Sequence, residues 1–393
     1  MRAVEEGRLA STSTAFKGHI DRCLGCRACE SVCPAGVEYG QLLEAARADL
    51  ARVKVNAGPA YALLSFLLRR VWVYPDRLRA AFGVGRFLRD SGIASFLIKT
   101  KIASGISARF EFGLLLLQGS QAQPAGHRRT VVPKGSQRPE VAENKTPIEV
   151  SLFTGCVTDG LFHRVNEATI RVLEANDCEV TQPPAQVCCG ALHAHAGDLE
   201  GARKLARENI EAFHQADGPI ITNAGGCGAM LVSYQHLLAN DSAYAEYARD
   251  FSARVRDIGQ QLTTEGFRNG GAIGYERTTY DASCHLLHGQ HAESDSLEML
   301  WAIPGLNFVM LKDSDVCCGG AGVYNLLEPE LSGVVLEEKL KQIEATGAEV
   351  LATGNPGCHM QIAAGARLAG LKLRVVHPVE LLDESYRRAG FYD

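Results

Sequence analysis

The chain has 393 residues, 46% of them hydrophobic, so it can bury more than one core, since a domain typically takes about 100–200 residues. Its formal net charge of −5 provides no basic field for nucleic acid, and we expect no nucleic acid partner. The first residues lack the apolar core of a secretory signal, and no apolar run reaches the roughly 18 residues of a membrane helix. We therefore expect a cytoplasmic protein without a transmembrane segment, either free or peripheral at the inner face of the cell membrane.

The first cysteines of the chain form a C-x2-C-x2-C-x3-C-P run, at Cys23, Cys26, Cys29 and Cys33. In a reducing cytosol, cysteines serve as metal ligands or redox groups more often than as disulfides. Bacterial ferredoxins have this run, in which close thiolates hold one [4Fe–4S] cluster and the cysteine before proline reaches a neighbouring cluster. Zinc is the alternative, but zinc sites usually pair two separated C-x2-C motifs. We predict a ferredoxin-type segment over residues 1–50, with these four cysteines as metal and cluster ligands.

Two segments without such motifs follow. Residues 51–120 are predicted to be a helical spacer, because apolar stretches such as 63–68 are followed by basic residues such as Arg69 and Arg70. The spacer either packs on the rest of the chain or forms a docking surface for a partner protein. Residues 121–147 are polar and contain four prolines, which predicts a flexible linker.

Eight further cysteines form two copies of one pattern. In the first copy Cys156 is followed after 31 residues by Cys188-Cys189-Gly190 and after 37 more by Cys227. In the second copy Cys284 is followed after 32 residues by Cys317-Cys318-Gly319 and after 39 more by Cys358. This is an internal repeat, and it predicts two related domains over residues 148–268 and 272–393.

Strands and helices alternate around these cysteines. The first copy has apolar strand candidates at Glu149–Phe153, Glu179–Thr181 and Pro219–Thr222, a helix at Phe162–Ala175 and a second helix capped by Asp198. The second copy has strand candidates at Thr278–Asp281, Phe308–Leu311 and Glu349–Thr353. Alternation of this kind indicates a parallel sheet, and ligands bind beyond the carboxyl ends of such strands. The predicted fold class is α/β, with a small ferredoxin-like, helical N-terminal part before two repeated α/β domains with parallel sheets.

Every cysteine of the repeat lies at or after the end of a predicted strand. Each domain should therefore gather four thiolates in one crevice as metal and cluster ligands: Cys156, Cys188, Cys189 and Cys227 in the first, Cys284, Cys317, Cys318 and Cys358 in the second. Nearby glycines either make tight turns or let the backbone approach a cluster, at Gly190, Gly225, Gly226, Gly319, Gly320 and Gly322. No GxGxxG run is present, so we expect no nicotinamide or flavin site in this chain.

The remaining candidates are one cysteine and four histidines. Cys178 belongs to no group and is predicted to be a small core residue. The histidines lie near the cysteine motifs, at His193, His195, His285 and His359. We expect packed or supporting roles for them, and donation of a hydrogen bond to a cluster or to a quinone is the alternative.

Three stretches resemble one known family, the iron–sulfur subunit of glycolate oxidase (glycolate dehydrogenase), at Leu24–Cys29, Gly36–Gly40 and Cys188–Gly197. That family combines a ferredoxin-type segment with two cysteine-rich CCG domains. The resemblance implies that a separate flavin-containing subunit oxidises glycolate to glyoxylate. It also implies that this chain holds [4Fe–4S] clusters and carries electrons toward the quinone pool, directly or through a membrane acceptor. It would then be an oxidoreductase subunit that is not catalytic alone.

The chain departs from related patterns in two places. Heterodisulfide reductases have a fifth cysteine per domain, where this chain has Ala224 and Asn355, so four ligands per domain favour an ordinary [4Fe–4S] cluster and electron transfer. The glycolate oxidase family has two ferredoxin runs and this chain has one, and Met1–Gly7 looks like a stretch between runs. We therefore expect the chain as given to begin after a first run, which would leave the Cys23–Cys33 run without its partner.

Three redox alternatives and one of another class remain open. The redox alternatives are iron–sulfur subunits of the heterodisulfide-reductase-like, lactate-utilisation and anaerobic glycerol-3-phosphate dehydrogenase types. The other class is a zinc-stabilised scaffold without a redox role. The substrate is not fixed by this chain, because it would bind the partner subunit.

Overall fold

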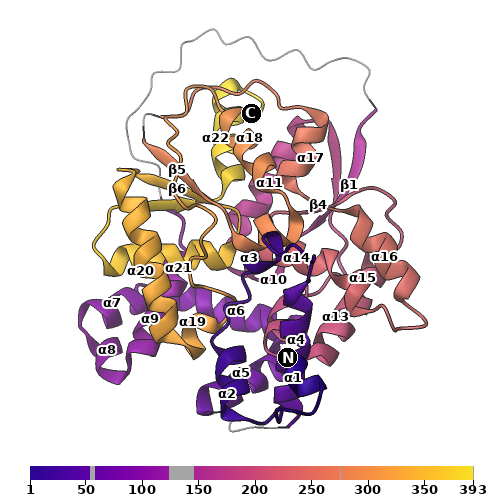
Figure 1. Cartoon of the computed structure of the whole chain (residues 1–393). Coiled ribbons are helices and arrows are strands. Elements are labelled where there is room, and N and C mark those ends of the chain that lie inside the picture. The colour runs from indigo at the N-terminus through magenta and orange to yellow at the C-terminus, as the bar shows by residue number, and fades with distance from the viewer. Residues whose placement is uncertain (54–57, 124–145, 275, 393) are drawn as a thin grey trace.

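The computed structural model describes residues 1–53, 58–123, 146–274 and 276–392. Figure 1 shows a helical N-terminal part beneath two α/β halves that contain all the strands. This confirms the predicted fold class. Most of the predicted linker at 121–147 lies outside the described residues. Among the described residues, no helix combines the length and the apolar character that crossing a bilayer requires.

The N-terminal segment consists of short helices around one small core. The helices are α1 (Arg2–Glu5), α2 (Thr14–Asp21), α3 (Ala28–Ser31) and α4 (Tyr39–Arg52). Helix α2 begins at Thr14 because the Ser13 hydroxyl accepts a hydrogen bond from the Phe16 amide at 3.3 Å. The core is made by side chains of α2 and α4, namely Phe16, Ile20, Leu43, Ala46 and Leu50. The cysteine run is therefore a loop, with α3 as its single turn of helix, held between these two helices.

The predicted spacer is helical, as expected. Its elements are α5 (Pro59–Leu67), the π-helix η1 (Leu68–Trp72), α6 (Pro75–Asp90), α7 (Ile93–Lys99), α8 (Ile102–Ile106) and α9 (Ala108–Gly119). Prolines open α5 and α6, where the missing amide hydrogen is not needed. The spacer packs on both halves. A Cβ on Gly119 of α9 would lie 3.1 Å from the Met360 carbonyl oxygen, and Arg86 of α6 donates to the Gly160 carbonyl at 2.6 Å.

The first α/β half is a four-stranded parallel sheet in the order β2-β1-β3-β4. Its strands are β1 (Ile148–Phe153), β2 (Cys178–Thr181), β3 (Ile220–Thr222) and β4 (Val255–Asp257). Its helices are α10 (Cys156–Leu161), α11 (His163–Ala175), α12 (Ala191–His195), α13 (Leu199–Ala212), α14 (Gly225–Val232), α15 (Tyr234–Leu237), α16 (Ala245–Arg254) and α17 (Ile258–Glu265). The three predicted strands are confirmed to within one residue, and β4 is an addition.

The second half is a three-stranded parallel sheet in the order β5-β6-β7. Its strands are β5 (Thr278–Asp281), β6 (Val350–Thr353) and β7 (Arg374–Val376). Its helices are η2 (Leu286–Gln290), α18 (Glu293–Trp301), α19 (Tyr324–Leu327), α20 (Pro329–Ala345), α21 (Pro356–Leu368) and α22 (Pro378–Ala389).

The predicted strand at Phe308–Leu311 is wrong. Only one bridge forms there, between Phe308 and Thr278. The chain then turns away from β5, because the Lys339 ammonium group donates to the backbone carbonyls of Asp313 and Ser314 at 3.1 and 3.0 Å. The segment is thus an edge contact followed by the loop that leads to Cys317.

The two halves share one hydrophobic core. It contains side chains of both sheets and of the helices between them, including Val150, Val172, Tyr280, Leu382 and Tyr386. Helix α22 of the second half lies against α11 of the first, where Arg171 forms two hydrogen bonds of 2.9 Å with Asp383. The halves therefore hold one another in place. The domain boundaries at 268 and 272 stay predictions.

Candidate metal centres

In the first half, four cysteines converge at the carboxyl ends of β1, β2 and β3. The sulfur atoms of Cys156 and Cys188 are 3.4 Å apart, and those of Cys189 and Cys227 are also 3.4 Å apart. Gly155 has a φ of 66°, and a Cβ at this position would lie 3.6 Å from the Cys227 sulfur. The positive φ favours glycine at the turn before Cys156, and this turn brings the backbone into contact distance of the thiols.

Neighbouring thiols perturb one another in this crevice. The hydrogen bond to Cys188, followed by burial, raises the pKa of Cys156 well above its ordinary value. The same hydrogen bond, together with one to Cys189, lowers the pKa of Cys188 well below its ordinary value. One thiolate is therefore favoured here, while further ionisation is opposed by charge repulsion. A bound cationic group would allow all four thiols to ionise.

The second half repeats the arrangement. The sulfur atoms of Cys284 and Cys317 are 3.9 Å apart, and hydrogen bonds to Cys317 and Cys358 raise the pKa of Cys318. Two polar groups donate to the sulfurs: the Gly319 amide to Cys317 and the Asn355 side-chain amide to Cys358, each at 3.4 Å. These donors would stabilise negative charge on thiolates or on a cluster.

The two crevices lie close together at the interface of the halves. The Gly225 amide donates to the Gly354 carbonyl at 2.9 Å, and the Gly226 amide donates to the Asn355 side-chain oxygen at 3.2 Å. A Cβ on Gly225 would lie 2.9 Å from the Leu286 Cβ. Asn355 therefore bridges the loop of Cys227 and the sulfur of Cys358.

The N-terminal cysteines lie in the loops around α3, and Cys29 is exposed. Backbone amides of Val37 and Ala35 lower the pKa of the Cys33 thiol, because they donate to its charged form. Burial raises the pKa of Cys26, and negative charge on Cys317 raises it further. The middle of the ferredoxin-type run therefore lies next to the second crevice.

Hydrogen bonds fix this segment to both halves. Arg47 donates to the Cys23 carbonyl at 2.6 Å and to the His195 carbonyl at 3.1 Å. The Tyr324 hydroxyl donates to the Arg22 carbonyl at 3.0 Å. The segment that carries the first cysteine group is thus in direct contact with both halves.

The residues present fit iron–sulfur clusters. Each half supplies four thiols, buried or nearly so, without a carboxylate among them, and amide groups donate to some of the sulfurs. A cavity of about 200 Å³ borders Cys156 and Cys188 and is also lined by Trp72 and Phe82 of the spacer. Within the described ranges, no group of three or more His, Cys, Asp or Glu side chains has the geometry to hold a single metal ion.

The predictions for the other residues can be compared directly. Cys178 is buried in the shared core, as expected. His193 is buried with its Nδ1 atom 2.9 Å from Asp198, and His359 packs edge-on against Phe162, so both are packed residues. Asp198 precedes α13 as predicted, but its side chain binds His193 instead of capping the helix.

The sequence did not indicate the buried ion pair between Lys339 and Asp281, whose charged atoms are 2.9 Å apart. Asp281 comes three residues before Cys284, and Lys339 holds the loop that leads to Cys317. The two residues are 58 positions apart, on a strand and on a helix. The local sequence offered one hint, namely that Lys339 falls among the apolar positions that face the core on α20.

Comparisons with known proteins agree with this architecture. A family model described as "Cysteine-rich domain" (CCG) matches residues 150–232 and 278–363. The chain is 34% identical to the "Probable glycolate oxidase iron-sulfur subunit" of Bacillus subtilis, over 98% of this chain and 86% of that protein. It is 28% identical to the "Glycolate oxidase iron-sulfur subunit" of Escherichia coli, over 99% of this chain and 86% of that protein. "Lactate utilization protein A" of Oceanobacillus iheyensis is 33% identical over 62% of this chain and 99% of its own length.

Proposed function

The chain belongs to the glycolate oxidase iron–sulfur subunit family, and we propose that it carries electrons from a flavin-containing subunit, which oxidises glycolate to glyoxylate, toward the quinone pool. The observation that carries this proposal is the convergence of four thiols in each half, with the ferredoxin-type run beside the second group. Closely spaced thiol groups of this kind favour a relay of redox centres over a single catalytic site.

In this proposal all twelve grouped cysteines are cluster ligands. They are Cys23, Cys26, Cys29 and Cys33 in the N-terminal segment and the two sets of four in the CCG halves. Bound [4Fe–4S] clusters would supply one-electron transfer. The protein would tune the potential of the cluster in the second half through the amides of Gly319 and Asn355 and the buried charge of Lys339.

A lactate-type substrate is the second candidate. The similarity to lactate utilization protein A covers 99% of that protein's length, so the part of this chain that it matches does not separate the two substrates. The extent of the match favours glycolate, because the relatives named for glycolate oxidase are matched over 98% or more of this chain and lactate utilization protein A over 62%. Co-purification of the native complex and a screen of 2-hydroxyacids would separate these candidates.

We propose further that the chain attaches peripherally to an anionic membrane surface through α6 to α9. Residues 75–119, which span these helices, hold seven Arg or Lys and three Asp or Glu, a formal charge of +4, whereas the whole chain is at −5. Seven large apolar side chains are exposed in the same region: Val84, Phe87, Ile93, Phe96, Ile102, Ile106 and Phe110. Helices α7 and α8 lie at the lower left edge of Figure 1, away from the sheets. Basic and apolar groups together bind the interface of anionic bilayers.

Vesicle sedimentation tests this attachment. The protein should sediment with vesicles that contain anionic lipid, and Phe96→Ser with Ile106→Ser should abolish this. A protein that ignores vesicles but loses its flavoprotein partner on the same substitutions would show that the surface binds the partner instead.

Metal analysis tests the cluster proposal. Anaerobically prepared protein should be brown and contain iron and acid-labile sulfide in near-equal amounts. Colourless protein that takes up zinc after anaerobic reconstitution would support the zinc-stabilised scaffold.

A further inference from the structure

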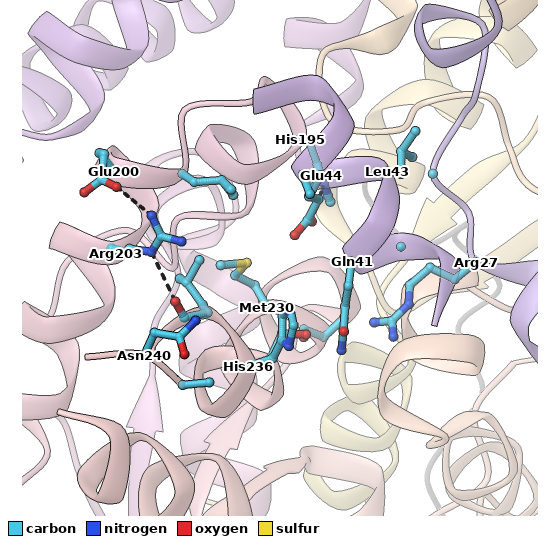
Figure 2. A pocket seen from close by; sticks show the side chains of 18 of the residues that line it. Arg27, Gln41, Leu43, Glu44, His195, Glu200, Arg203, Met230, His236 and Asn240 are labelled. Atoms are coloured by element: carbon cyan, nitrogen blue, oxygen red, sulfur yellow. Dashed lines mark hydrogen bonds and ion pairs between the residues drawn. The ribbon is translucent and has the colours of Figure 1, made fainter. Parts of the chain in front are cut away.

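A large cavity lies where the three parts of the chain meet. Its volume is about 660 Å³. Figure 2 shows Arg27, Gln41 and Glu44 of the N-terminal segment facing residues of the first half, among them His195, Arg203 and Met230. No cysteine lines this cavity, so it is separate from the predicted ligand sites.

The walls of the cavity include neighbours of cysteines from all three groups. Gly25 and Arg27 flank Cys26, Gly226 precedes Cys227, and His285 follows Cys284. A molecule in the cavity would therefore lie beside all three proposed cluster sites. This position suits a redox partner that collects electrons from several centres.

One wall contains three titratable side chains, those of Glu44, His195 and His285. The rings of His195 and His285 stack at 9° with their centroids 5.2 Å apart. The Nδ1 atom of His195 is 3.3 Å from a carboxylate oxygen of Glu44. Burial opposes ionisation of Glu44, but the hydrogen bond with His195 lowers its pKa overall. Glu44 therefore positions the His195 ring at the wall of the cavity, which both residues line.

The other walls argue against an anionic ligand. Arg203 and Arg207, the arginines on α13, each pair with a carboxylate at 2.6 Å, from Glu200 and Asp241. Arg27 pairs with Glu30 at 3.0 Å. The large apolar side chains of the lining are Leu43, Leu199, Met230 and Leu237. The lining thus combines paired charges, large apolar side chains and the histidines His195, His236 and His285, which fits a neutral ring that bears carbonyl oxygens.

We propose that this cavity binds a quinone ring and is the place where the chain delivers its electrons; this inference rests on the proposed function. The bound quinone takes up two electrons, which originate from the 2-hydroxyacid, and two protons, and leaves as the quinol. His195 gives one proton to a quinone oxygen, with Glu44 as its positioning partner, and is reprotonated from solvent. The second proton comes from water in the cavity.

The test uses the complex of the cluster-loaded chain with its flavoprotein. Decylubiquinone and menadione serve as quinones, and ferricyanide serves as a one-electron acceptor that needs no proton. His195→Gln and Glu44→Gln should lower quinone reduction about tenfold to a hundredfold and leave ferricyanide reduction and iron content unchanged. His163→Gln, an exposed histidine on α11, is the matched control and should change neither rate.

Leu199→Trp tests occupancy of the cavity independently of proton transfer. Equilibrium dialysis should show that the cluster-loaded chain binds menadione and that Leu199→Trp does not. Equal quinone rates and equal menadione binding in all these variants would overturn the cavity assignment. If the unsubstituted complex reduces its clusters with glycolate but reduces no quinone, the proposed function fails instead.

Discussion

Replacing Lys339 by methionine tests how the second crevice is held together. The side chains of Lys339 and Asp281 are 0% and 1% exposed, with the ammonium 2.9 Å from the carboxylate. The same ammonium group holds the carbonyls of Asp313 and Ser314. Removing one partner of a buried ion pair costs about 3–5 kcal/mol, because the other charge is left without compensation. The two carbonyls lose their donor as well, so the loop before Cys317 should loosen.

Protonation of Asp281 sets the pH dependence of this loss. Burial raises the pKa of Asp281, and Lys339 opposes that rise. Without Lys339 the carboxyl should be neutral in the folded state up to a higher pH. A carboxyl whose pKa is higher in the folded than in the unfolded state stabilises the folded state when it is protonated. This stabilisation is complete below the unfolded-state pKa and is lost as the pH rises through the folded-state pKa. Lys339→Met should therefore be least harmful at acidic pH and most harmful at neutral pH.

Thermal unfolding of the cluster-loaded protein measures the effect. At about 2–4 °C per kcal/mol, Lys339→Met should lower Tm by roughly 6–20 °C near neutral pH. The second CCG half should also lose iron. Lys341→Met is the control on the same helix, since Lys341 is 60% exposed and its pairs with Glu337 and Glu338 lie at the surface. A Tm for Lys339→Met within 2 °C of the Lys341→Met value, with full iron content, would refute the reasoning.

Two further predictions concern the contact between the halves. Gly225→Ala should destabilise the protein by about 1–3 kcal/mol, because the added Cβ would lie 2.9 Å from the Leu286 Cβ. The control Gly333→Ala adds a Cβ in open space on α20 and should stabilise the protein by up to about 1 kcal/mol. Urea unfolding of the two variants measures both effects. Asn355→Leu removes the hydrogen-bond donor to the Cys358 sulfur, so the reduction potential of the second CCG cluster should fall. A redox titration followed by electron paramagnetic resonance measures this potential, and an unchanged value would contradict the prediction.

The sequence predicted the elements whose signals are local. Strands such as Thr278–Asp281 are short apolar runs that end just before a cysteine, and their parallel pairing follows from the alternation with helices. The convergence of four cysteines in each half was predicted for the same reason. The segment Phe308–Leu311 carried the same apolar signal, but Lys339, a residue far along the chain, draws the following loop away from the sheet.

Features that depend on distant contacts were not predicted. Glu44, His195 and His285 meet at one cavity although they are far apart in the sequence. His195 lies 151 positions after Glu44, and His285 lies 90 positions after His195. No periodicity in the sequence connects them. The contact of α22 with α11 was missed for the same reason, because an amphipathic helix shows that it has a partner but not which one.

Electron paramagnetic resonance of the complex with its flavoprotein, reduced by glycolate, tests the central claim most directly. Glycolate should reduce the clusters of this chain within the turnover time. Cys188→Ser should remove the signal of the first CCG half and Cys317→Ser that of the second, while Cys178→Ser in the shared core should remove neither. Quinone reduction should fall in the first two variants only. If the flavoprotein turns over glycolate and reduces quinone at the same rate while these clusters stay oxidised or are absent, the chain does not carry the electrons.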